Sequence, residues 1–267
     1  MEKGRGFENK LEEQSVALET WKKDWQSWYK DQQKTKFREV LNKYGVVISE
    51  NECDQHFNSI NILSQSEFEK KIREIEDCSE DEAEKIANKE WGFLDAKSNK
   101  IYINPVKQDG RIIPANGRIV PHEVLHLSST MLNADQETIR SGMITDEKSR
   151  RLGEIIINAI DTEIAQEYVG SIPPPPGHEF LNVLRGIIPF ELWVRASFTN
   201  KDYELLQKEV EERLGQDGFE LICLLCKYNL WYELVGIISK TKDEINLPEH
   251  VETEDKEKIM SIVNGLG

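Results

Sequence analysis

Apolar residues recur every three or four positions over most of this chain, which is the spacing of one face of a helix. The longest pattern runs from residue 11 to residue 41, where neither proline nor glycine interrupts it. A second covers residues 64–89, with Ser64 or Ser66 as its expected cap and a fresh start at Ser79. Further helices are predicted over residues 150–168, 180–192, 201–214, 218–228, 231–240 and 254–263.

Extended segments are few and short. Residues 91–104 consist of two extended pieces around Ala96–Asn99, which is typical turn chemistry, and they predict a β-hairpin. Val46–Ile48 is a candidate for one more short strand. Residues 105–117 are predicted to form a loop, and the four consecutive prolines at 173–176 to form a stiff spacer. These patterns predict a mainly helical α+β fold.

Length and charge limit the organisation and the partners. With 267 residues, we expect an amino-terminal docking or regulatory helix over 1–45, a core over 46–170 and a carboxy-terminal helical part over 171–267. The net charge of −15 argues against nucleic acid as a partner, because the phosphate backbone would be repelled. It is compatible with a protein or peptide substrate.

Three tryptophans form one stripe on the amino-terminal helix. Trp21, Trp25 and Trp28 are spaced four and three residues apart, so they share a helix face. This stripe either packs onto the rest of the protein or docks a partner.

The cysteines and the most apolar segment indicate neither a disulfide scaffold nor a membrane span. We expect buried, inert thiols at Cys223 and Cys226, which lie in an apolar helical pattern with no second pair to complete a metal site. Residues 219–238 include charged side chains and are predicted to be a core helix. The first ten residues do not resemble a signal peptide, so the chain is expected in the cytosol unless a secretion system that needs no cleaved signal exports it.

The candidate chemistry lies in residues 122–126, which read His-Glu-Val-Leu-His. On a helix, His122 and His126 lie one turn apart on the same face, so both imidazoles can bind one metal ion. Glu123 is then placed to accept a proton from a water on that ion. Pro121 suits the first turn of such a helix.

A catalytic zinc takes a third protein ligand, and the helix over 150–168 is its expected source. This helix has acidic residues among its isoleucines, and burying a carboxylate is costly unless a charge pairs with it. The candidates on it are Glu154, Asp161, Glu163 and Glu167.

These residues resemble the zincin metallopeptidases, and among them the thermolysin-like glutamate zincins. In that group a second helix carries N-E-x-x-S/T-D/E, and residues 162–167 read Thr-Glu-Ile-Ala-Gln-Glu, departing at Thr162 and Gln166. The resemblance implies Glu163 as the third ligand and Glu167 as the acid that orients a histidine. Asp161 is the reserve ligand and Glu154 a weaker alternative.

The resemblance covers residues 91–170 and extends to small bacterial toxin- and effector-type zincins. It implies a zincin core with a small sheet or hairpin beside the metal-binding helix, flanked by helical extensions. It also implies one Zn²⁺ and an endopeptidase that cuts a specific protein, with residues 100–104 as the strand on which an extended substrate pairs. Oxyanion stabilisers would come from Tyr168, His178 or Arg185.

Two other functions stay open from the residues alone. One is a degenerate zincin that acts as a protein–protein interaction module. The other is a peptidase that cleaves a repressor inside the producing cell. His56 and His250 belong to no pattern and are expected to be exposed.

Overall fold

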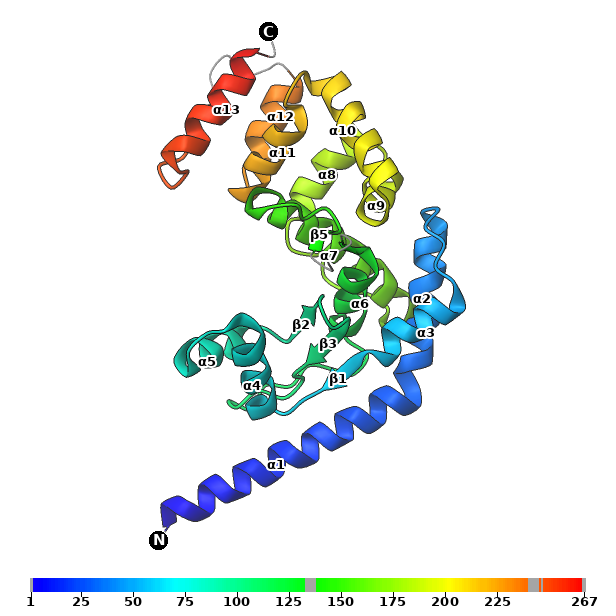
Figure 1. The fold of residues 1–267 in the computed structure, drawn as a ribbon, viewed down its shortest axis with the longest axis vertical. Coiled ribbons are helices and arrows are strands. Elements are labelled where there is room, and N and C mark those ends of the chain that lie inside the picture. The colour runs from blue at the N-terminus through cyan, green and yellow to red at the C-terminus, as the bar shows by residue number, and fades with distance from the viewer. Residues whose placement is uncertain (1, 133–137, 240–244, 246, 266–267) are drawn as a thin grey trace. The chain divides into compact units, whose positions relative to one another are not determined.

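The computed structural model describes residues 2–132, 138–239, 245 and 247–265. It confirms a mainly helical α+β fold with short strands (Figure 1). In chain order the elements are α1 (Glu2–Asp24), the π-helix η1 (Trp25–Tyr29), α2 (Lys30–Lys43), α3 (Glu50–Asn58), β1 (Ile60–Ile62), α4 (Gln65–Glu76), α5 (Glu80–Lys89), β2 (Gly92–Asp95), β3 (Lys100–Ile103), α6 (Ile119–Ser129), β4 (Thr130–Leu132), β5 (Thr138–Ser141), α7 (Glu147–Val169), α8 (His178–Ile187), α9 (Phe190–Phe198), α10 (Asn200–Leu214), α11 (Gly218–Lys227), α12 (Trp231–Ser239) and α13 (Thr253–Gly265).

The chain divides into two compact units whose boundaries differ from the expected division at 45 and 170. The first comprises residues 1–41, 47–128 and 163–172, and the second comprises 42–46, 129–162 and 173–267. The amino-terminal helices therefore belong to the unit that holds the small sheet and most of α6.

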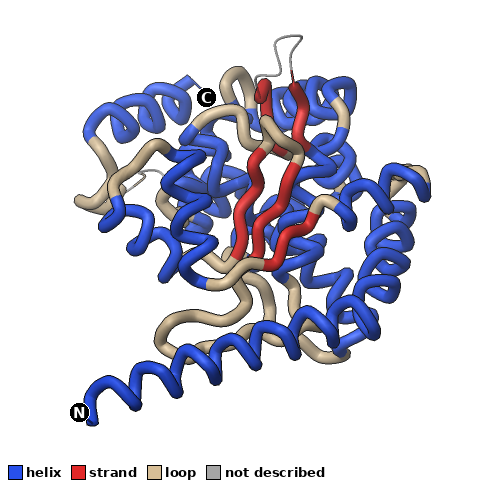
Figure 2. Tube along the Cα trace, turned by 60° about the horizontal axis from the view of Figure 1, so that its bottom comes forward, coloured by secondary structure: helices blue, strands red, loops and turns tan. Residues whose placement is uncertain are grey.

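The sheet of the first unit has three strands in the order β1-β3-β2, side by side in Figure 2. β2 and β3 form the predicted antiparallel hairpin, with Gly92 opposite Ile103. Asn99 closes its turn with a φ of 51°, a left-handed conformation that asparagine tolerates. β1 pairs with β3 in parallel. Because β3 has a neighbour on both sides, the expectation that residues 100–104 form a free substrate-binding edge is wrong.

The third strand of the sheet is not the segment that the sequence suggested as a short strand. Val46–Ile48 has no strand structure and leads into Ser49, whose hydroxyl accepts from Glu52 N and caps α3. The third strand is β1, beyond that helix. Three residues are too few for the alternation of apolar and polar side chains to distinguish a strand from a loop. Pairing with β3 therefore decides which short segment forms a strand.

Two capping boxes start the helices that cover this sheet. Ser64 and Ser79 each accept a hydrogen bond from the backbone of a glutamate three residues later, whose carboxylate accepts from the serine backbone in return. These caps confirm the predicted start at Ser64 and the break before Ser79. The helices α4 and α5 then pack Phe68, Ile72 and Ala87 into one cluster with Tyr102 of β3.

The tryptophan stripe is divided between core and surface. Trp21 and Trp25 stack with ring centroids 6.2 Å apart and are 4% and 2% exposed, whereas Trp28 is 72% exposed. Partner docking through Trp21 and Trp25 is therefore wrong. The π-helical turn η1 begins at Trp25, and its wider winding turns Trp28 away from the face that the first two rings share.

The second unit is mainly helical. The predicted helix over 180–192 is interrupted at Ile188–Pro189, which separates α8 from α9. Trp193 of α9 is fully buried and stacks on Phe219 of α11. Cys223 and Cys226 are free and buried, as predicted, and burial raises the pKa of the Cys226 thiol to about 12. No helix in the described part of the chain is long and apolar enough to span a bilayer.

Candidate metal centre

The helix that carries the His-Glu-x-x-His residues is anchored by its apolar face. In α6, Val120, Val124 and Leu125 are fully buried, so the register of the helix is set by core packing. Pro121 lies in the first turn, as predicted, where its missing N–H costs no hydrogen bond. His122 N donates to Arg118 O at 2.9 Å and closes that turn.

The two histidines have the geometry of a shared metal ion. His122 Nε2 and His126 Nε2 lie 3.2 Å apart, and both side chains are half-buried. A zinc ion bound to two imidazole nitrogens at 2.0–2.1 Å in a tetrahedral arrangement holds those nitrogens about 3.4 Å apart. The spacing of the two Nε2 atoms therefore fits the edge of a tetrahedral zinc site.

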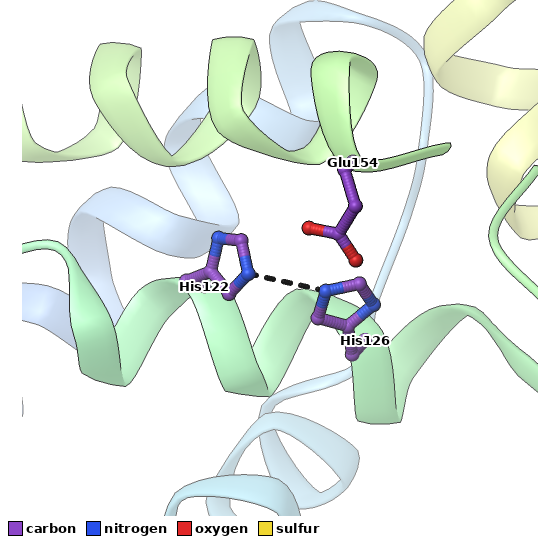
Figure 3. A group of neighbouring side chains, drawn as sticks. All are labelled: His122, His126 and Glu154. Atoms are coloured by element: carbon purple, nitrogen blue, oxygen red, sulfur yellow. Dashed lines mark hydrogen bonds between the residues drawn. The ribbon is translucent and has the colours of Figure 1, made fainter. Parts of the chain in front are cut away.

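A carboxylate completes the set. One ligand atom each from His122, His126 and Glu154 lies within 4.8 Å of the other two (Figure 3). Glu154 is half-buried on α7 and points its carboxylate at the imidazoles in Figure 3. Two imidazoles and one carboxylate are a common donor set of catalytic zinc, and they leave one tetrahedral position for water.

Glu163, the ligand that the resemblance implied, is not in this group of neighbouring side chains among the described residues. It follows Glu154 by nine residues, or about two and a half helical turns, and so lies on the opposite face of α7. Asp161 follows Glu154 by about two turns and shares its face. Asp161 is fully buried and its Oδ1 accepts from Thr162 Oγ1 at 3.2 Å.

Glu167 does not take the histidine-orienting place that the resemblance implied. Its exposed carboxylate lies 3.6 Å from Lys36 Nζ, so it forms a surface ion pair with α2. Such a pair stabilises little, because water screens both charges.

Glu123 is buried, with only 6% of its surface exposed. Its side chain lies against the first residue of β2: a Cβ placed on Gly92 would be 2.9 Å from Glu123 Cγ and Oε1. A water-poor setting of this kind strengthens the electrostatic interactions of a carboxylate.

The loop that leads into α6 is held by side chains of the amino-terminal helices. Gln14 Nε2 donates to Gln108 O at 2.9 Å, and Trp21 Nε1 donates to Ile113 O at 2.8 Å. Gln33 is fully buried, and its Nε2 donates to the carbonyls of Ala115 and Gly117 at 3.3 Å each.

The orientation of that Gln33 amide is itself determined. Trp25 Nε1 donates to Gln33 Oε1 at 3.0 Å, which leaves the amide N–H groups to face the loop. These helices therefore hold the loop that leads into α6, and a docking or regulatory role for them stays a prediction.

A buried lysine anchors the start of the same loop. Lys107 is fully buried, and its Nζ donates to Ala87 O at 2.5 Å and to Glu90 O, both at the carboxyl end of α5. The ammonium lies 4.6 Å from the ring centroid of Trp91. Burial lowers the pKa of Lys107 to about 8. The cation–π contact and the carbonyls of a helix end are the groups that suit a cation removed from water.

His56 was expected to be exposed, and this is wrong. It is half-buried, and its Nδ1 lies 2.9 Å from Ser128 Oγ on α6. Since Ser128 Oγ donates its proton to Val124 O at 2.7 Å, His56 Nδ1 is the donor in the first contact. Burial lowers the pKa of His56, so the neutral form is favoured. His250 is exposed, as expected.

The candidate oxyanion stabilisers have other contacts in this structure. Tyr168 donates from its hydroxyl to Gly117 O at 3.4 Å, at the end of the supported loop. His178 Nδ1 lies 3.3 Å from Glu179 Oε2. The Arg185 guanidinium lies 4.5 Å from the ring centroid of Phe190. Of the three, Tyr168 is tied to the segment that directly precedes α6.

Comparison with known proteins adds no assignment. No family model, no curated protein and no solved structure matches this chain.

Proposed function

We propose that this protein is a zinc-dependent endopeptidase that hydrolyses a peptide bond in a specific protein substrate. The observation that carries the proposal is the facing pair of Nε2 atoms, 3.2 Å apart, with the Glu154 carboxylate beside them. Two histidines one turn apart on a helix, next to a glutamate, are the residues that such chemistry needs.

Each side chain has one role in this proposal. His122, His126 and Glu154 hold one Zn²⁺, which when bound lowers the pKa of a coordinated water and polarises the substrate carbonyl. Glu123 accepts the proton of the attacking water and returns it to the leaving amine. Tyr168 does not serve as the oxyanion donor, because it follows Glu154 by fourteen residues on α7, which is about 21 Å along the helix axis.

An extended substrate needs a strand edge, and the available one beside Glu123 is β2. Among the described strands, β2 pairs on one side only, with β3. Its first residue, Gly92, lies against the Glu123 side chain. We therefore place the substrate backbone along the unpaired edge of β2.

The resemblance to small toxin- and effector-type zincins leads us to propose the same biological class for this chain. It would be made in the cytosol and delivered into a target cell by a secretion system that needs no cleaved signal. The degenerate interaction module remains the opposing hypothesis, and it differs in one measurable respect: it needs no catalysis by Glu123.

The test compares the wild-type protein with Glu123→Ala. We expect both to bind one equivalent of zinc, measured by metal analysis and calorimetry, because Glu123 is not a ligand. Proteomic profiling of cleaved termini should show new sites for the wild type, with the rate lowered by about 10²–10⁴-fold or more in the variant.

His126→Ala is the matched control on the same helix face and should lose both zinc and cleavage. Zinc binding without any Glu123-dependent cleavage would favour the interaction module. No uptake of zinc by the folded wild-type chain would overturn the proposal.

A further inference from the structure

We infer that Gly92 is a positioning residue for Glu123: its missing side chain creates the space in which the Glu123 carboxylate is held. This inference rests on the proposed function, in which Glu123 is the proton acceptor. It concerns a residue on a different element from the His-Glu-x-x-His motif, which only the fold brings beside it.

Glycine is needed at position 92 because there is no space for a side chain. Gly92 does not adopt a positive φ, so its backbone conformation is open to any L-amino acid. It pairs with Ile103 in the β2–β3 ladder and is buried. An added Cβ would lie 2.9 Å from Glu123 Cγ, 2.9 Å from Glu123 Oε1 and 2.9 Å from Ile103 Cδ1.

The contact with Glu123 Cγ is the decisive one. Oε1 and Ile103 Cδ1 are ends of flexible side chains and can move away by rotation. Cγ is one bond from Cβ, and the position of Cβ is fixed by α6, whose register is set by the buried Val120 and Val124. A methyl group on residue 92 therefore forces the Glu123 side chain out of its rotamer or displaces α6 from β2.

The chemical consequence follows from the precision that proton transfer needs. A general base must lie within hydrogen-bond reach of the proton that it accepts, and a misplacement of about 1 Å costs about 10²-fold in rate. The backbone of Gly92 closes one side of the space around Glu123. The glycine both admits the carboxylate and limits where it points.

The experiment uses Gly92→Ala in the full chain. We expect kcat to fall by about 10²-fold with KM nearly unchanged, and one equivalent of zinc to remain bound. The acid limb of the pH–rate profile should shift, because the carboxylate of Glu123 moves to a different environment. Gly186→Ala is the control, since a Cβ on Gly186 meets nothing within 4 Å.

A second pair of variants separates Glu123 from Ile103. Ile103→Val removes the Cδ1 that the new methyl would meet, so Gly92→Ala/Ile103→Val retains only the clash with Glu123. We expect the double variant to stay as slow as Gly92→Ala, with Ile103→Val alone close to wild type. Recovery of kcat in the double variant would show that core crowding caused the loss and would overturn the inference.

Two further outcomes bear on it directly. Wild-type kcat in a zinc-loaded Gly92→Ala protein would overturn it while leaving the proposed function intact. If the wild type neither binds zinc nor cleaves, the proposed function fails, and a crystal structure of Gly92→Ala still decides the positioning. An unmoved Glu123 carboxylate in that structure refutes it, and a displaced carboxylate supports it.

Discussion

Helices α6 and α7 both supply side chains to the candidate metal centre, but they differ in how much their sequences reveal. In α6, the spacing of the two histidines places them one turn apart on the same helix face, with the glutamate next to the first of them. In α7, five acidic residues lie along one helix, and a carboxylate of any of them suits a metal. Local spacing identifies the candidate ligands on α6, whereas a tertiary contact has to choose among the candidates on α7.

The choice in α7 depends on which helix face is turned to the imidazoles. Glu163 and Glu167 lie one turn apart and share a face, and Glu167 pairs with Lys36 at the surface. Glu154 and Asp161 lie on the other face, about two turns apart. The family motif, when it is aligned with residues 162–167, selects Glu163 and Glu167. The group of neighbouring side chains among the described residues contains only Glu154 from this helix.

The strongest test of this difference is to exchange each candidate ligand for its amide. We expect Glu154→Gln to weaken zinc binding by more than about 100-fold, beyond the 10–100-fold that loss of a ligand's hydrogen-bond partner costs. Glu163→Gln is the matched control and should bind zinc almost as the wild type does. Competition titration with a chromogenic chelator measures both.

Asp161→Asn extends the same series. It removes a buried charge on the Glu154 face, and we expect an intermediate loss of zinc affinity, about tenfold. If Glu163→Gln or Asp161→Asn loses zinc while Glu154→Gln keeps it, the assignment of the third ligand is reversed.

A smaller effect is expected from the support of α6. Gln33→Ala removes the donor to the carbonyls of Ala115 and Gly117 and the acceptor of the Trp25 indole N–H. Because these groups are left buried without that partner, the free energy of unfolding should fall by about 1–3 kcal/mol. Chemical denaturation measures it, and amide hydrogen exchange should quicken over residues 113–122.

Gln32→Ala is the control for this loss, since Gln32 is exposed on the same helix. Equal stability of the two variants would mean that other contacts hold the loop before α6. Gln33 would then not contribute to the support of that helix.

A dependence of stability on pH is expected at the other end of that loop. Lys107 has a pKa of about 8 in the folded protein, below its ordinary value, so the folded state binds fewer protons than the unfolded state between the two values. The cost of burying the charge is present in full below pH 8 and is relieved as the pH rises towards 10. The wild type should therefore gain stability over Lys107→Met across this range.

Denaturation of both proteins at pH 7, 8, 9 and 10 reveals the trend, and Lys97→Met in the exposed hairpin turn is the control. A stability difference that stays constant with pH would show that the Lys107 ammonium keeps its ordinary pKa although it is buried.

Sequence alone determined the features that depend on near neighbours. The helices that start at Ser64 and Ser79, the β2–β3 hairpin and the burial of Cys223 and Cys226 were all predicted, because capping, turn chemistry and helical spacing act within a few residues. The His-Glu-x-x-His residues belong to the same class, since one helical turn sets the distance between their imidazoles.

Only the tertiary structure decided which distant segments meet. It placed β1 beside β3 and so closed the expected substrate edge, and it buried Trp21 and Trp25 while leaving Trp28 exposed. It brought Glu154 to the histidines and Gly92 to Glu123. None of these contacts has a signature in local spacing, because each depends on how a whole helix or strand is turned and packed.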